Sequence, residues 1–132
     1  MKFQYPESWT IVQIGNINIQ PEYLLYKGQY KLKIIRVQGG SEECVFNSNF
    51  DSGMADFFID ISKYNYKIIN SKIGKFYYFN TGSQYEFCGP SANLNTKLVK
   101  ISAAGLITFE TPTSPDPELM KEMEDIISSI EE

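Results

Sequence analysis

Five acids in the segment 42–60 are the residues with the clearest potential for chemistry. They are Glu42, Glu43, Asp51, Asp56 and Asp60. Carboxylates are the ligands that Ca²⁺ and Mg²⁺ prefer, and paired carboxylates can run hydrolysis. The spacing of these acids matches no EF-hand loop, and acidic loops are more often solvated than metal-bound. We therefore expect no metal ion and no cofactor in this segment.

The chain has two cysteines and no histidine. The lack of histidine excludes His-dependent serine and cysteine hydrolases, His-ligated metal sites and a histidine pH switch. Cys88, beside Gly89 and Pro90, would need a helix N-terminus or a lysine to become a nucleophile. Because two cysteines are too few for a disulfide scaffold, free buried thiols are the simpler interpretation of Cys44 and Cys88, and the sequence leaves open whether the two are paired. With no nucleophile–base pair and no phosphate-binding glycine motif, we predict that the protein is not an enzyme.

Segment 63–79 interleaves lysines with aromatic residues. The lysines are Lys63, Lys67, Lys72 and Lys75, and the aromatic residues are Tyr64, Tyr66, Phe76, Tyr77, Tyr78 and Phe79. Lysines that contact phosphates and rings that stack on bases are what a single-stranded nucleic-acid platform uses. The alternative is a hairpin with its rings inward and its lysines outward, which the acidic composition of the chain favours. Small-ligand or single-stranded nucleic-acid binding by this segment is the second functional hypothesis.

The C-terminal residues, about 116–131, have the strongest helical pattern in the chain. Apolar residues recur there at the spacing of one helical face, namely Leu119, Met120, Met123, Ile126, Ile127 and Ile130. Asp116 is a good N-cap, and Pro117 suits the first helical position because no backbone hydrogen bond is lost there. Residues 110–132 hold eight acids and one lysine, a net charge of −7. We predict an acidic amphipathic helix that packs on the rest of the fold.

Short apolar and aromatic runs, separated by turn residues, fill most of the remaining chain. The runs are 30–34, 64–68, 74–79, 85–88, 98–101 and 106–109. The turn composition at 70–72 predicts a hairpin. The alternation that starts at Tyr30 shifts phase at Ile35 and Val37, which indicates either a bulge or a strand buried on both faces. Residues 21–27 fit a short helix or a strand. The predicted fold class is α+β: a mainly antiparallel β-sheet packed against a C-terminal amphipathic helix.

Length and composition predict one folded domain, residues 1–132. Hydrophobic residues make up 42% of the chain and charged residues 21%, which lies outside the range of disordered proteins. The apolar runs are much shorter than the roughly 18–20 residues that cross a bilayer, so no membrane span is expected. Residues 1–6 contain no apolar signal-peptide core, which favours a cytoplasmic location, although a chain with a trimmed export signal would begin in the same way.

The two ends of the chain resemble the Mog1/PsbP/DcrB-like group of small α/β/α proteins. The segment from Phe3 to Trp9 resembles the opening strand of that group and its Pro-x-x-Trp turn. The run 107–109, the Pro-containing linker and the helix ending at Ile130 resemble the closing strand and helix. The resemblance implies a mostly non-enzymatic protein, such as a binding subunit, an adaptor or a secretion chaperone. It assigns no functional residue, and Trp9 is interpreted as a core anchor.

The leading functional hypothesis is a non-catalytic protein-binding module. An inhibitor or immunity-type protein that masks a basic partner protein fits the compact, acidic chain without a catalytic site. The contact surfaces are expected on the acidic loop and the acidic helix. The predicted partner-binding residues are Glu42, Glu43, Asp51, Asp56, Glu118, Glu122, Glu124 and Asp125.

Overall fold

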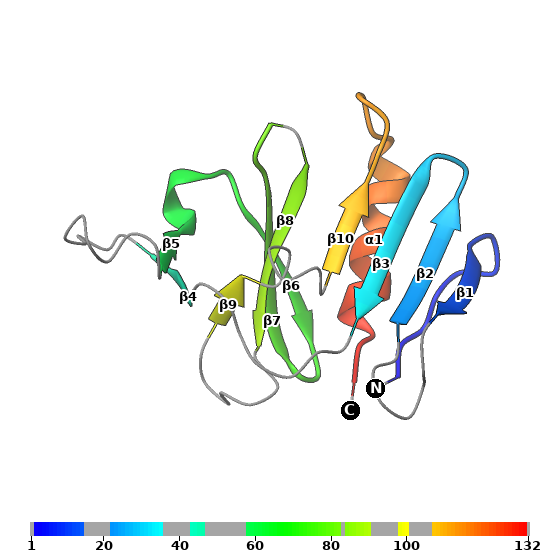
Figure 1. Ribbon diagram of the computed structural model, residues 1–132, viewed down its shortest axis with the longest axis horizontal. Coiled ribbons are helices and arrows are strands. Elements are labelled where there is room, and N and C mark those ends of the chain that lie inside the picture. Colours follow the sequence, from blue (N-terminus) through cyan, green and yellow to red (C-terminus); the bar gives the residue numbers. More distant parts are fainter. Residues whose placement is uncertain are drawn as a thin grey trace.

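The computed structural model describes residues 2–14, 22–35, 43–46, 58–82, 84–90, 98–100 and 107–131. Within these ranges the chain forms β-strands, a short 3₁₀ helix and one α-helix (Figure 1). The strands are β1 (Thr10–Ile14), β2 (Glu22–Lys27), β3 (Tyr30–Ile35), β4 (Glu43–Val45), β5 (Phe58–Asp60), β6 (Lys67–Ser71), β7 (Gly74–Asn80), β8 (Tyr85–Pro90), β9 (Leu98–Lys100) and β10 (Ile107–Glu110). The helices are η2 (Ile61–Lys63) and α1 (Pro117–Ser128). None of the helices in these ranges is long and apolar enough to cross a membrane.

All ten strands join one sheet in the order β1-β2-β3-β10-β8-β9-β4-β5, with β7 and then β6 attached to β8. Among the described strands only the pairing of β4 with β5 is parallel, so the predicted mainly antiparallel sheet with a C-terminal helix is confirmed. Strand β8 joins the two parts of the sheet. Its first residue, Tyr85, pairs with β10, whereas its last residues, from Cys88 to Pro90, pair with β9.

Helix α1 begins where the sequence predicts it and ends at Ser128, about three residues before the predicted end. The Asp116 carboxylate accepts a hydrogen bond of 2.9 Å from the backbone N–H of Glu118, and Pro117 occupies the first helical turn. The hydroxyl of Tyr30 accepts a second hydrogen bond, of 2.7 Å, from the backbone N–H of Asp116. The N-cap therefore fixes the start of the helix and also ties it to β3.

The main core lies between α1 and the face of the sheet that it covers (Figure 1). The helix buries Met123, Ile126 and Ile127 completely. The strands supply most of the opposing side chains, which include Leu25, Leu32, Ile69, Phe76, Tyr78, Phe87 and Phe109. Trp9 is buried in the same core, as predicted, and its backbone N–H donates to the carbonyl of Pro6. The burial of this apolar stripe is what holds α1 on the sheet.

A second, smaller core lies beside β4 and η2. Its buried members are Cys44, Ile61, Phe79 and Cys88. Cys44 and Cys88 form a disulfide, with a distance of 6.4 Å between their Cα atoms. The sequence left this pairing open, and the simpler interpretation of two free thiols is wrong. The two cysteines are 44 residues apart in the sequence, and only the pairing of β4, β9 and β8 brings them together.

Three further elements refine the sequence prediction. Residues 22–27, whose state the sequence left open, form strand β2, which pairs with β1 and β3. The predicted hairpin is formed by β6 and β7, but its first strand begins at Lys67 and its turn is at Lys72 and Ile73. Strand β3 keeps its alternation through Ile35 without a bulge, and Val37 lies outside the described residues.

Candidate functional site

The side of β6 and β7 that faces away from α1 carries an exposed cluster of aromatic side chains. Along β7, Phe76 and Tyr78 point into the main core, so Tyr77 and Phe79 point to the opposite face. Ile68 pairs with Tyr77 and therefore lies on that face as well. We use the term aromatic patch for the exposed or partly exposed residues gathered here. They are Phe46, Tyr64, Tyr66, Ile68 and Tyr77.

The rings of the aromatic patch hold one another in place. Phe46, Tyr66 and Tyr77 form a three-membered cluster in which the ring centroids are 5.3–5.6 Å apart and every pair is edge-to-face. Tyr64 stacks on the buried ring of Phe79 at 4.7 Å. Each such aromatic pair contributes about 0.5–1.5 kcal/mol beyond its area burial. The patch is therefore an ordered surface built from interlocking rings.

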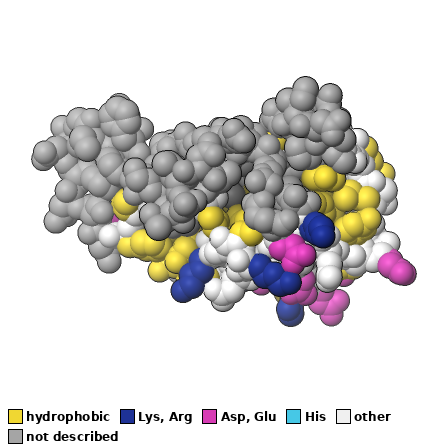
Figure 2. Space-filling model, turned by 90° about the horizontal axis from the view of Figure 1, so that it is seen from below, with side chains coloured by type: hydrophobic (Ala, Val, Ile, Leu, Met, Phe, Trp, Pro, Cys, Tyr) yellow, Lys and Arg dark blue, Asp and Glu magenta, His cyan; other side chains and the backbone are white. Residues whose placement is uncertain are grey.

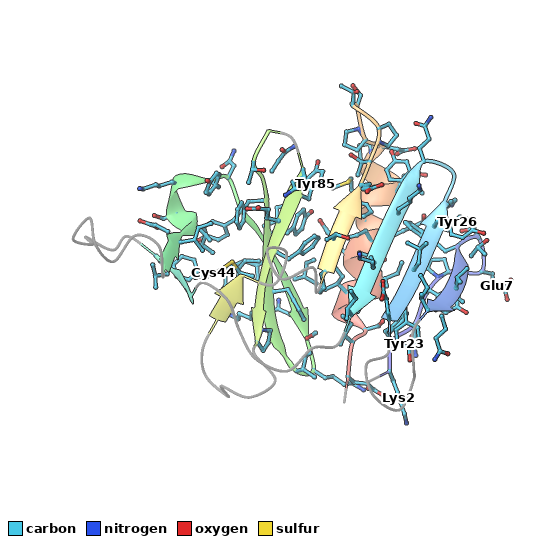
Figure 3. The ribbon with its side chains drawn as sticks, in the orientation of Figure 1. Lys2, Glu7, Tyr23, Tyr26, Cys44 and Tyr85 are labelled. Carbon is cyan, nitrogen blue, oxygen red and sulfur yellow. A yellow bond between two sulfur atoms is a disulfide. The ribbon has the colours of Figure 1, made fainter. Side chains whose placement is uncertain are left out.

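Two structural features position Phe46 in this cluster. Phe46 follows β4, and Cys44 two residues earlier is bonded to Cys88 of β8. Cys88 is paired with Tyr77 across the β7–β8 ladder. The disulfide therefore fixes the end of β4 next to the strand that carries Tyr77, and Figure 3 shows Cys44 in this part of the sheet.

Four large hydrophobic residues of the aromatic patch stay exposed, namely Phe46, Tyr64, Tyr66 and Ile68. Ile68 keeps 49% of its surface exposed, Phe46 41% and Tyr66 37%. From below, Figure 2 shows hydrophobic side chains at the left and at the right of the described surface, with lysines and acids intermixed between and below them. A contiguous apolar patch that remains exposed is typical of an interaction site.

Two lysines flank the aromatic patch. Lys75 precedes Tyr77 by two residues on β7 and shares its face, and Lys63 directly precedes Tyr64. Both lysines are exposed, and within the described ranges neither forms an ion pair. The patch therefore has free positive charge at both of its ends.

The structure disperses the nucleic-acid platform that segment 63–79 suggested. Lys67 pairs with Tyr78 and lies on the α1 side of the sheet. Lys72 donates to Glu131 at 2.7 Å, and this hydrogen bond and the opposite charge raise the pKa of Lys72. Phe76, Tyr78 and Phe79 are buried. Only half of the lysines and half of the rings of segment 63–79 remain at one surface.

Two of the predicted partner-binding acids on α1 are engaged inside the molecule. The Glu122 carboxylate accepts hydrogen bonds from the Trp9 indole at 3.0 Å and from Lys27 at 3.3 Å. The Glu124 carboxylate accepts a hydrogen bond from the Tyr78 hydroxyl. Burial, followed by the bond to Glu124, raises the pKa of Tyr78. Both acids are partly buried and act as structural acceptors at the edges of the helix.

The remaining predicted partner-binding residues do not form a single surface in the part of the chain described. Glu118 is exposed, and Asp125 is exposed and paired with Lys121 at 3.0 Å. Glu43 lies in β4, where its backbone pairs with Phe58 and Val99. Glu42, Asp51 and Asp56 lie outside the described residues.

We expect Glu122→Lys to lower the free energy of unfolding by about 1–3 kcal/mol, because the buried indole N–H of Trp9 then has no acceptor. Trp9 is the single tryptophan of the chain, so its fluorescence during urea unfolding measures the change. Glu118→Lys makes the same change of charge at an exposed position and should cost less than about 1 kcal/mol, mainly through the helix dipole. Equal losses in the two variants would contradict the structural role of Glu122.

Other candidate sites are weaker. Among the described residues, no group of three or more Cys, Asp and Glu side chains could hold a metal ion. An open pocket of about 550 Å³ lies between the β7–β8 turn and the connector from Thr111 to Pro115. Of its described lining residues only Glu110 is charged. This pocket therefore lacks the paired groups that acid–base or nucleophilic catalysis requires.

No family model, curated protein or solved structure matches this chain. The aromatic patch, with its flanking lysines and the disulfide that positions Phe46, is therefore the candidate site on geometry alone.

Proposed function

We propose that this chain is a non-catalytic protein-binding module that contacts its partner through the aromatic patch. The observation that carries the proposal is the exposure of Phe46, Tyr66 and Ile68 side by side on an ordered sheet face. Aromatic residues are enriched at the centres of protein interfaces, where a few of them supply most of the binding energy. A sheet face with interlocked rings also loses little conformational entropy when it binds, because its side chains are already ordered.

The contact surface differs from the acidic helix that the sequence suggested. Glu122 and Glu124 are used as hydrogen-bond acceptors within the fold. An inhibitor or immunity-type role toward a basic partner stays a prediction, and on α1 it rests on Glu118 and Asp125. The variant Glu118→Lys tests it without disturbing the core, since a basic partner that uses this helix should bind the variant more weakly.

The disulfide bears on the compartment of the protein. Disulfides persist in oxidising environments and are rare in the reducing cytoplasm. We propose that the protein works in an oxidising compartment, in place of the cytoplasmic location that the sequence suggested. The bond between Cys44 and Cys88 supports this proposal.

Kinship with the Mog1/PsbP/DcrB-like group also remains a proposal. The two ends that carry the resemblance lie side by side (Figure 1), with a backbone bridge between Lys2 and Glu131. The Pro-x-x-Trp turn is formed, but Phe3 to Pro6 is not a strand. Members of that group are mostly non-enzymatic binding proteins, which agrees with the function proposed here.

The proposal is tested by cross-linking from the patch. A photoreactive benzoylphenylalanine in place of Tyr66 is used to capture and identify the partner in an extract of the native host. The affinity of the purified partner is then measured by titration calorimetry. We expect Tyr66→Ser to weaken binding about 30-fold or more, the loss of about 2 kcal/mol typical of a central interface aromatic.

Tyr26→Ser is the matched control. Tyr26 has nearly the same exposed fraction as Tyr66, 38% against 37%, but lies at the opposite end of the sheet from Cys44 (Figure 3). We expect the control to bind the partner like the wild type. A partner that binds both variants equally well would rule out the aromatic patch as its contact surface.

A further inference from the structure

We propose that the aromatic patch, together with Lys63 and Lys75, binds an extended segment of a partner protein that carries acidic residues on both sides of an apolar or aromatic centre. The inference rests on the proposed function and adds the chemistry of the partner. It follows from how charge is arranged around the patch.

The two lysines lie at opposite ends of the row of rings. From Lys75 the face continues through Tyr77 to Phe79, which spans about 13 Å along a strand. Tyr64 stacks on Phe79, and Lys63 is its neighbour in the chain. The two ammonium groups are therefore separated by the whole length of the aromatic patch.

Both lysines are available to a partner. Each is exposed, and within the described ranges neither has an ion pair, in contrast to Lys27, Lys72 and Lys121. Asp60, three residues before Lys63, and Glu86, which pairs with Phe79, are already engaged. Asp60 caps η2 through Ser62, and Glu86 accepts from Gln84. Free positive charge at the ends of an apolar surface complements a partner with negative charge at matching positions.

The separation of the lysines sets the spacing of the partner's acids. An extended chain advances about 3.3 Å per residue. Acids that reach both lysines are therefore about four to six residues apart, and the residues between them lie over Phe46, Tyr66 and Ile68. A flat sheet face accepts an extended segment because alternate side chains of such a segment can rest on the rings.

The observations favour a protein segment over single-stranded nucleic acid. Binding of a nucleic-acid backbone depends on several phosphate contacts, and each contact needs a cation on the same surface. Lys67 lies on the other face of the sheet, and Lys72 is paired with Glu131. The chain as a whole is acidic, with a net charge of −4. Two lysines suit a pair of carboxylates better than a continuous row of phosphates.

The test uses random displayed peptides of about 12 residues, long enough to cover roughly 40 Å when extended. They are selected on the intact, oxidised protein, and the affinities of enriched peptides are measured by fluorescence anisotropy. We expect enriched sequences with Asp or Glu on both sides of an apolar or aromatic centre. Their binding should weaken at least tenfold in the Lys63→Glu/Lys75→Glu variant and more than tenfold in Tyr66→Ser.

A variant with the same change of charge controls for long-range electrostatics. Lys31 on β3 and Lys121 on α1 are exposed and lie away from the patch, and the ion pair of Lys121 with Asp125 is at the surface. Lys31→Glu/Lys121→Glu should reduce peptide affinity less than threefold, because salt screens charges beyond about 8–10 Å. Equal losses in the two double variants would overturn the role of Lys63 and Lys75.

The other outcomes also decide the inference. Enriched peptides that need Tyr66 but are neutral or basic would overturn the inference that the partner segment is acidic, and would leave the proposed function intact. A failure to enrich any peptide that depends on Tyr66 would overturn the inference, while the cross-linking experiment judges the proposed function separately. If an oligothymidylate bound more tightly than every enriched peptide, and if Tyr66→Ser abolished that binding, the patch would be assigned to single-stranded nucleic acid instead.

Discussion

Replacing both cysteines with alanine should lower the free energy of unfolding by about 4 kcal/mol. The bond between Cys44 and Cys88 closes a loop with a sequence separation of 44 residues. In the chain-entropy model, a cross-link over a loop of this length removes about that much conformational freedom from the unfolded chain. This loss is a large part of the roughly 5–15 kcal/mol that stabilises a typical domain.

The same substitution should also disturb the candidate site. Cys44 and Cys88 form half of the small buried core, together with Ile61 and Phe79. Without the bond, the strand pairings that hold β4 among the described residues are the short ones with β5 and β9. Phe46 should then leave Tyr66 and Tyr77 more often, so binding through the aromatic patch should weaken along with stability.

Urea unfolding of the oxidised protein, with and without dithiothreitol, measures the effect. The reductant should shift the wild type toward the lower stability of the Cys44→Ala/Cys88→Ala variant and leave that variant unchanged. Alkylation of the denatured, unreduced wild type should modify neither cysteine. Modification of both, together with unfolding that does not respond to the reductant, would show that the thiols are free.

Ile126→Ala should cost about 2–5 kcal/mol, the range for truncation of a fully buried aliphatic side chain. Ile126 is completely buried between α1 and the sheet. Alanine favours the helix more than isoleucine does, so helix propensity offsets a small part of the loss. The loss of unfolding free energy in Ile126→Ala therefore reports how well α1 packs on the main core.

Ile68→Ala is the matched control for this second prediction. It removes the same atoms at a position that is 49% exposed in β6, and should cost less than about 1 kcal/mol, mostly through strand propensity. Urea unfolding followed by circular dichroism gives both values. A loss for Ile126→Ala as small as that for Ile68→Ala would mean that α1 is not seated on the sheet as described.

Local patterns predicted most of the longer elements of this fold, but they did not predict β1, β4, β5 or η2. The spacing from Leu119 to Ile130 and the Asp116-Pro117 start define α1, because a helix is specified by contacts between residues that are near in sequence. The hairpin of β6 and β7 was predicted for the same reason, although its boundaries moved by two or three residues. Residues 22–27 were ambiguous locally, and pairing with β1 and β3 decided that they form a strand.

Long-range contacts decided how the elements are arranged in space, and this arrangement forms the candidate site. The disulfide joins residues whose proximity depends on the order of β4, β9 and β8, which no local pattern encodes. A helical acid looks like a surface charge in the sequence, yet Glu122 meets Trp9 from the other end of the chain. Most residues of the aromatic patch belong to segment 63–79, where lysines and rings alternate. Alternation along β6 and β7 places some of these lysines and rings on the patch face and the others on the face that α1 covers.

The sequence by itself determined an acidic α+β fold with a capped amphipathic C-terminal helix, because capping and apolar periodicity act between neighbours in the chain. Only the tertiary structure decided which charged groups remain free and which rings remain exposed. Burial and ion pairing are properties of residues that meet in space, and here they leave Lys63, Lys75 and the aromatic patch open to a partner.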